Sequence, residues 1–286
     1  MTVTLVARRL SSLVRLEHTL FALPYAYVGA IFAVDGRPSL HDLVWITVAM
    51  AGARSLAMAL NRLIDAEIDA RNPRTARREL PAGLLSRTQV LVFCAVSLAV
   101  FALAVSQLAP ITRWLAPIPV AAFVVYPYLK RFTPLCHLWL GAVDGLAPVG
   151  AWVAITNTVD WQPFLLGGVV CFWIAGFDVI YATMDYEHDR QQGLHSIPAD
   201  WGIAAGLKVT RLFHALAVVF MVLAGIALDT GAIYYLGVAI CAVLLAYENA
   251  IVKPDDLSRV NAAFFNVNAI LAGIYLLAVI GDVAVR

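Results

Sequence analysis

Three polar residues spaced four apart, Asn61, Asp65 and Asp69, carry the strongest chemical signal in the sequence. In a helix this spacing brings all three side chains onto one face, with the two carboxylates about 6 Å apart along the axis. The preceding residues, from Leu43 to Leu60, are almost all apolar, so the helix would otherwise lie in hydrocarbon. A carboxylate there is costly and indicates function. The alternative is a charged helix end in a solvated loop.

A second pair of aspartates repeats this pattern far along the chain. Asp185 and Asp189 are four residues apart and close another apolar run, in the segment FDVIYATMDYEHDR. Asp178 precedes Asp185 by seven residues, and Arg54 precedes Asn61 by the same interval. Two such pairs at the ends of apolar runs are a much stronger signal than one.

Basic residues surround both motifs. Five arginines follow the first pair, at positions 71, 74, 77, 78 and 87. Four carboxylates and an amide are oxygen ligands that suit Mg²⁺, and arginine and lysine bind phosphate groups. The candidates for binding a diphosphate are Arg74, Arg77, Arg78, Lys130 and Arg190. A diphosphate held beside an apolar interior implies a lipid diphosphate.

The composition is that of an integral membrane protein. Hydrophobic residues make up 62% of the chain and charged residues 14%, with a mean hydropathy of +0.81. The net charge of +1 gives no indication of a nucleic acid partner. The four cysteines are far apart and favour neither disulfides nor a zinc site. No boundary divides residues 1–286, which we expect to form one domain.

Nine apolar runs are long enough to span a bilayer and predict an all-α, polytopic protein. They fall at about 17–34, 43–65, 88–108, 113–129, 135–156, 162–183, 207–228, 231–250 and 262–281. The residues before them read as a short amphipathic helix at the membrane interface rather than a cleavable signal.

The basic residues predict the orientation. Of 20 Lys and Arg residues, sixteen belong to the N-terminus or to the junctions at 62–87, 130–131, 190–211 and 253–259. The positive-inside rule places these segments in the cytoplasm. We therefore expect a multi-pass protein of the inner (plasma) membrane, with both motifs facing the cytoplasm and the C-terminus outside.

Four strings resemble the UbiA-type intramembrane prenyltransferases in the same order: NRLIDAEID, RELPAG, YPYLKRFT and DVIYATMDYEHD. The resemblance covers nearly the whole chain and implies nine helices around a central cavity. It also implies that five residues bind two magnesium ions and through them the diphosphate, the four aspartates being catalytic. These residues are Asn61, Asp65, Asp69, Asp185 and Asp189.

The resemblance also assigns roles deeper in the cavity. Lys130 would contact the diphosphate and Tyr126 would line the cavity, while Arg54 could meet the carboxylate of an acceptor. Asp178 is placed with the acceptor site. The alternative for Arg54 is a permanent ion pair with Asp178 or Asp144. The chain departs from many members at Arg62 and Glu79, and both departures bear on the acceptor.

The implied reaction transfers a polyprenyl chain from its diphosphate to a ring carbon of a hydroxylated aromatic acid in quinone biosynthesis. The strings MALNRLIDAEIDARNPRT and QGLHSIPA favour 4-hydroxybenzoate as that acid, with 1,4-dihydroxy-6-naphthoate as the alternative. An ion-coupled transporter is the non-enzyme alternative, but it would bury its carboxylates near the midplane of the bilayer.

The charge asymmetry gives a topological prediction. A reporter fused after Arg78 or Arg190 should read as cytoplasmic, and one fused after Arg286 as external, because basic residues are retained inside. Paired phosphatase and fluorescent-protein fusions at the three positions would measure this. A cytoplasmic C-terminus would contradict the odd number of spans.

Overall fold

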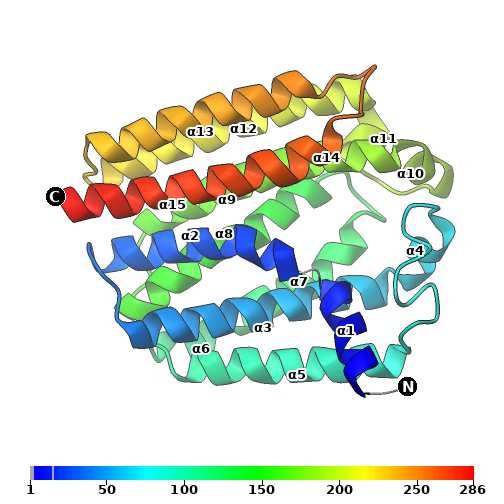
Figure 1. Ribbon diagram of the computed structural model, residues 1–286, viewed down its shortest axis with the longest axis horizontal. Helices are drawn as coiled ribbons and strands as arrows, with labels where there is room; N and C mark the ends of the chain where they lie inside the picture. The colour runs from blue at the N-terminus through cyan, green and yellow to red at the C-terminus, as the bar shows by residue number, and fades with distance from the viewer. Residues whose placement is uncertain (1–2, 15) are drawn as a thin grey trace.

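The computed structural model describes residues 3–14 and 16–286, and within them the chain is almost entirely helical, without a β-strand (Figure 1). The long helices are α2 (Leu16–Ala33), α3 (Leu40–Ile64), α5 (Arg87–Ser106), α7 (Pro117–Leu129), α8 (Cys136–Thr156), α9 (Gln162–Ala182), α12 (Ile203–Ala227), α13 (Ala232–Ile251) and α15 (Asn268–Val285). The shorter ones are α1 (Val3–Val14), α4 (Ala66–Arg71), α6 (Ile111–Leu115), α10 (Tyr186–Gln192), α11 (Ile197–Trp201) and α14 (Val260–Ala262), with a 3₁₀ turn at Thr183–Asp185 and a π turn at Ala263–Val267.

Each of the nine predicted spans has a helical counterpart. Seven helical segments in the described chain are long and apolar enough to cross a membrane. The other two predicted spans correspond to α2 and to the pair α6–α7, which is divided where Pro117 begins α7. Proline has no N–H to continue a helix and fits its first turn. The chain is thus a multi-pass membrane protein.

The polar connections gather at one end of the helix assembly. Helices α4, α10 and α11 lie together at the right of Figure 1, whereas the α2–α3 and α12–α13 turns lie at the left. The polar connections after the two aspartate motifs are partly helical, since they contain α4, α10 and α11. Helix α15 ends at the left of Figure 1, opposite the polar connections.

Helix α1 joins the bundle through its last residues. Leu13 and Val14 are buried and pack in one apolar cluster with Leu56 and Ala59 of α3. The amphipathic helix predicted at the N-terminus is present, and it packs on the helix that carries the first motif.

The largest core fills the half of the bundle built from α2, α9, α12, α13 and α15. Trp173 is fully buried at its centre, and the Tyr25 ring lies 4.8 Å from it between centroids. Tyr275 also stacks on Tyr25, with ring centroids 5.7 Å apart. Such aromatic contacts stabilise the fold beyond the burial of apolar area alone. This half is therefore tightly packed, and the rest of the bundle packs against it.

Helices α8 and α9 approach each other closely through glycines. A Cβ atom added at Gly141 would lie 2.0 Å from the carbonyl oxygen of Cys171, and one at Gly145 would lie 2.6 Å from that of Gly167. Small residues of this kind let helix backbones meet inside a membrane. The close contact fixes the register of α8 on α9.

Gly141→Ala should therefore lower the free energy of unfolding by about 1–3 kcal/mol, because the helices must separate to admit the methyl group. Thermal unfolding of the purified protein in detergent would measure this. Gly150→Ala on the same helix is the matched control, since an added Cβ there meets no atom within 4 Å. Equal effects of the two substitutions would contradict the close-packing account.

Candidate active site

Both aspartate motifs bend their helix at the first aspartate. Asp65 separates α3 from α4 with φ −93° and ψ 4°, and Asp185 ends the 3₁₀ turn before α10 with φ −102° and ψ 6°. This bridge region of backbone space is sparsely populated and common at active sites. The helix is therefore interrupted at both residues, although the Asp65 N–H still donates to the Asn61 carbonyl at 3.0 Å and the Asp69 N–H to the Asp65 carbonyl at 2.8 Å.

Asp65 is held by two cations from the end of α7. Its Oδ2 lies 2.6 Å from Lys130 Nζ, and its Oδ1 lies 3.3 Å from Arg131 Nη2. Only 1% of Asp65 is exposed. This burial raises the pKa of Asp65 above its ordinary value, and the positive charge of Lys130 opposes the shift.

Asp69 is paired within its own segment. Both of its carboxylate oxygens lie 2.8 Å from Arg78 Nη1, and Arg62 Nη1 lies 3.9 Å from Oδ2. The Thr75 hydroxyl donates to the Asp69 backbone carbonyl at 2.9 Å and ties the loop after α4 back onto that helix.

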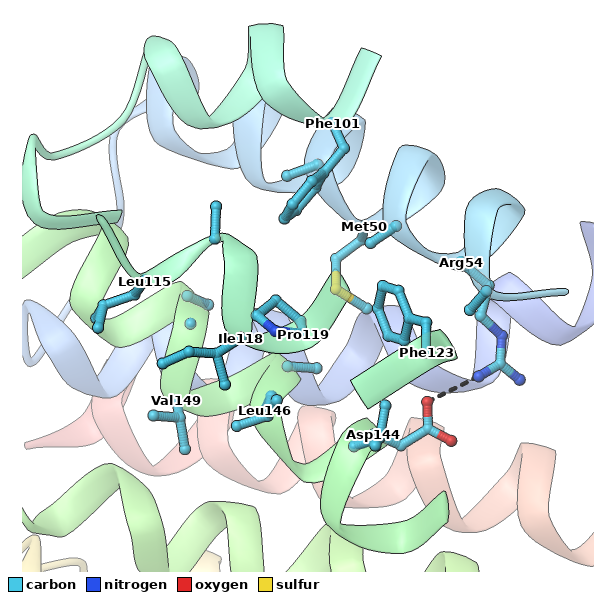
Figure 2. Close-up of a pocket in the computed structure, with 18 of the residues that line it drawn as sticks. Met50, Arg54, Phe101, Leu115, Ile118, Pro119, Phe123, Asp144, Leu146 and Val149 are labelled. Carbon is cyan, nitrogen blue, oxygen red and sulfur yellow. Dashed lines mark hydrogen bonds and ion pairs between the residues drawn. The ribbon is translucent and has the colours of Figure 1, made fainter. Parts of the chain in front are cut away.

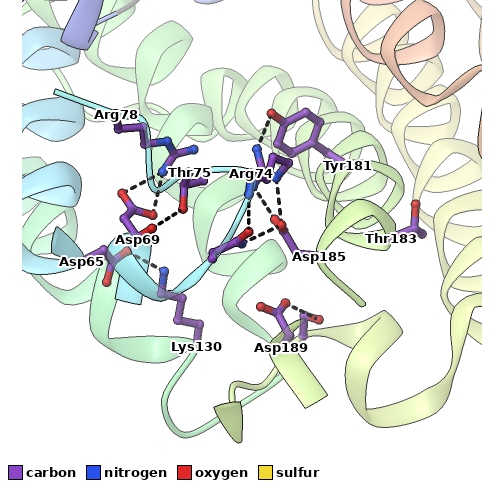
Figure 3. A network of polar contacts seen from close by, with 12 residues as sticks. Asp65, Asp69, Arg74, Thr75, Arg78, Lys130, Tyr181, Thr183, Asp185 and Asp189 are labelled. Carbon is purple, nitrogen blue, oxygen red and sulfur yellow. Dashed lines mark hydrogen bonds and ion pairs between the residues drawn. The ribbon is translucent and has the colours of Figure 1, made fainter. Parts of the chain in front are cut away.

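Asp185 joins the second motif to the first. Arg74, from the loop after α4, donates through Nε to Asp185 Oδ1 at 2.8 Å and through Nη2 to Oδ2. Asn72 Nδ2 donates to the same Oδ1 at 2.8 Å. A forked arginine–carboxylate pair is among the stronger polar contacts, so the two motifs are bound across the end of the bundle (Figure 3).

The predicted residues fall into two groups. The four aspartates lie in one polar region with Arg74, Arg78 and Lys130, and Asp189 accepts a hydrogen bond from Ser196 at 3.3 Å (Figure 3). Arg77 and Arg190 are exposed; Arg190 stacks on Tyr186, and within the described chain neither forms an ion pair with the aspartates.

The donor chemistry of this region fits magnesium. Among the residues that the structure describes, no three His, Cys, Asp or Glu side chains converge on one metal position, because the aspartates face cations instead. The oxygen donors are nevertheless of the hard type that Mg²⁺ prefers. Asn61 lies at the inner edge of the same region and lines the cavity below it.

Sequence reasoning missed several partners of the aspartates. Arg62 and Arg131 are next to predicted residues in sequence, and their charge was the available signal. Asn72 and Ser196 carry no such signal, since their role depends on how the loops fold over the end of the bundle.

An apolar cavity of about 620 Å³ extends from the polar region into the bundle (Figure 2). It is lined by α3, α5, α6, α7 and α8, and small residues of α3 such as Ala53 and Ala57 leave room for it. At the far end its lining includes Ile118, Val159 and Phe164, each more than half exposed. The cavity therefore reaches the apolar outer surface of the bundle.

Arg54 and Asp144 form an ion pair inside this cavity. Arg54 Nη1 lies 2.8 Å from Asp144 Oδ1, joining α3 to α8 (Figure 2). The pairing alternative for Arg54 is thus realised with Asp144. Arg54 Nε, however, is buried without a hydrogen-bond partner. Tyr126 lines the cavity as predicted, and Asp178 pairs with His137 rather than with Arg54.

The fold and the site define a polytopic membrane protein with an apolar cavity that ends in a cluster of aspartates and basic residues. Residues 22–270 match the model of the UbiA prenyltransferase family. The chain belongs to this family. Membership favours the enzyme over the ion-coupled transporter.

Individual relatives agree with this assignment. The chain is 31% identical to a 4-hydroxybenzoate octaprenyltransferase of Vibrio cholerae serotype O1 over 94% of this chain and 93% of the relative. It is 34% identical to a UbiA homologue from Aeropyrum pernix K1 solved in its apo form, over 93% of this chain and 98% of that one, with a TM-score of 0.84.

A more distant structure shares the fold. A UbiA homologue from Archaeoglobus fulgidus, bound to DMAPP and Mg²⁺, is 18% identical to this chain, with 97% of this chain and all of that one covered and a TM-score of 0.72.

Proposed function

We propose that the protein transfers a polyprenyl chain from its diphosphate to a ring carbon of 4-hydroxybenzoate in ubiquinone biosynthesis. The observation that carries this proposal is the apolar cavity, which extends from a cluster of aspartates and basic residues to the apolar outer surface of the bundle. A lipid diphosphate fits this arrangement, with its head at the aspartates and its tail among the helices. The named relatives act on 4-hydroxybenzoate and thus support the choice of acceptor.

The head group would be held by the polar region. Asn61, Asp65, Asp69, Asp185 and Asp189 would hold Mg²⁺, which when bound supplies charge neutralisation of the diphosphate and makes it a leaving group. Lys130, Arg74 and Arg78 are already at the aspartates and would turn toward phosphate oxygens. Arg77 and Arg190 would act from the exposed rim.

The acceptor would be held deeper, at Arg54. Its unpartnered Nε offers a hydrogen bond that Asp144 does not use, and the aromatic carboxylate would accept it. Tyr126 and Asp178 belong to the same region of the bundle. 1,4-Dihydroxy-6-naphthoate carries the same recognition groups and is the second candidate.

The chain's contribution to the reaction is to position the substrates and exclude water. The diphosphate leaves with the bonding electrons of its C–O bond, and the ring carbon beside the phenolic hydroxyl attacks the allyl cation that remains. The apolar lining protects that cation from water, as a closed site does. The charge pattern supports a plasma-membrane location with this site facing the cytoplasm.

The direct test is product formation. Membranes containing the protein should convert geranyl diphosphate and 4-hydroxybenzoate, with Mg²⁺, into the prenylated acid detected by mass spectrometry. Asp65→Asn and Asp185→Asn should each reduce turnover at least about 10²-fold without unfolding the protein, since each removes the negative charge of a ligand rather than a packing contact. EDTA should abolish turnover, and added Mg²⁺ should restore it.

The matched control for these variants is Asp255→Asn, which changes an exposed carboxylate in the loop between α13 and α14. It should keep wild-type turnover. Full activity of the Asp65 or Asp185 variant would contradict the metal role. Product formed only with 1,4-dihydroxy-6-naphthoate would contradict the choice of acceptor but not the reaction.

Donor and acceptor sites should separate kinetically. Arg54→Lys should raise the KM for the acid about tenfold and leave that for the diphosphate nearly unchanged, because lysine cannot bind Asp144 and a second carboxylate in one plane. Lys130→Ala should instead raise the KM for the prenyl diphosphate. Initial rates with each substrate varied would measure both. If Arg54→Lys lowers stability and affects both substrates alike, Arg54 serves only its pair with Asp144.

A further inference from the structure

His137 and Asp178 form a pair outside the aspartate cluster, and the proposed function so far assigns no chemical step to it. His137 Nδ1 lies 2.7 Å from Asp178 Oδ2 and joins the beginning of α8 to α9. The backbone N–H of Ile197 lies 3.3 Å from His137 Nε2 and can only donate to it. In this arrangement Nε2 accepts from Ile197, and Nδ1 carries the proton that is donated to Asp178.

One carboxylate oxygen of Asp178 is available for a further hydrogen bond. In the described chain, its Oδ1 takes part in no hydrogen bond, and 20% of the side chain is exposed although the surrounding helix is buried. The carboxylate is close enough to interact electrostatically with Tyr126 and Asp144, which both line the cavity. An oxygen without a partner in the described chain thus lies near two residues that line the cavity.

Helix geometry gives the depth of this oxygen. Asp178 lies on α9, seven residues before Asp185 at the end of the following 3₁₀ turn, and is therefore about 10 Å below the aspartate cluster. Asp144 is seven residues after His137 on α8, so the Arg54–Asp144 pair lies about 10 Å deeper still. Asp178 is therefore at the level between the leaving group and the acceptor carboxylate.

The orientation of the acceptor follows from these levels. With its carboxylate on Arg54, an aromatic acid of this shape directs its hydroxyl edge toward the aspartates. That edge carries the carbon that receives the prenyl group. Among the side chains at this level, Tyr126 is a neutral phenol and Asn61 an amide, both weak bases. Asp178 is a carboxylate with an unused oxygen.

We propose that Asp178 is the base that accepts the ring proton in the last step of the reaction, an inference that rests on the proposed function. Once the new C–C bond has formed, the C–H bond at the same carbon breaks and its electron pair restores the aromatic ring. The proton goes to Asp178 Oδ1. His137 is a positioning residue: its Nδ1–H holds Oδ2 and directs Oδ1 toward the substrate.

The test replaces Asp178 by the isosteric Asn, which can still accept from His137. The rate of prenylated-acid formation is compared for normal acceptor and acceptor deuterated on the ring. Asp178→Asn should lower kcat about 10²-fold or more while KM for either substrate stays within about twofold. A primary isotope effect, small in the wild type, should appear because proton loss has become rate-limiting. Asp178→Glu should recover part of the rate.

Two results would overturn the proposal. Unchanged kcat and isotope effect in Asp178→Asn would assign the proton to an oxygen of the departing diphosphate. A loss of rate with no isotope effect and a lowered thermal unfolding midpoint would assign Asp178 to structure. Product formation by the wild type tests the proposed function separately, since the base assignment depends only on the ratio between variant and wild type.

His137 has its own pair of variants. His137→Asn places an amide N–H near the Nδ1 position and should keep most of the rate, whereas His137→Leu should show a reduced kcat together with the isotope effect. A Leu variant with the wild-type isotope effect would contradict the positioning role of His137.

Discussion

Buried carboxylates at the end of apolar helices impose the central constraint on this structure. Asp65 and Asp69 are 1% and 5% exposed, and an uncompensated charge at such a position is strongly destabilising. Each is therefore met by cations, which come from the end of α7 for Asp65 and from the loop that directly follows its own helix, α4, for Asp69. The α4 loop and the α7–α8 junction take their positions from this requirement. Ion pairs thus hold the loops at this end of the bundle in place.

The packing of the helices divides the bundle into two parts with different tasks. The aromatic cluster around Trp173 makes α2, α9, α13 and α15 a solid body, whereas α3, α5 and α7 surround empty space with α8. Helix α8 belongs to both, because its glycines meet α9 on one side and Asp144 meets Arg54 on the other. The cavity can keep its shape because one of its walls is part of the rigid body. A site that must position a cation beside a ring carbon needs such a wall.

The spans, the two aspartate motifs and their position at the same end of the bundle could be predicted from the sequence, since apolar run length and four-residue spacing are local properties. The partners of the charged side chains could not be predicted in this way. Arg74 and Asp185 are 111 residues apart, Arg54 and Asp144 are 90 apart, and His137 and Asp178 are 41 apart. Each contact depends on which helices are neighbours and in what register, which glycine contacts such as Gly141 on Cys171 help to set. Four-residue spacing also does not reveal the bends at Asp65 and Asp185, because it defines a common face only in an ideal helix.

The charges at the aspartate cluster give a physical reason for the metal proposed to accompany the donor. Arg62, Arg74, Arg78, Lys130 and Arg131 are five cations in contact with three of the four aspartates, so this region is close to neutral by itself. A diphosphate brings more negative charge than this small difference can balance, and each cation that turns to a phosphate oxygen leaves a buried carboxylate behind. Divalent ions held by the carboxylates would compensate both charges at once. Without a metal, the same cations that would bind the donor are committed to the aspartates, so donor binding and metal binding should be coupled through these ion pairs.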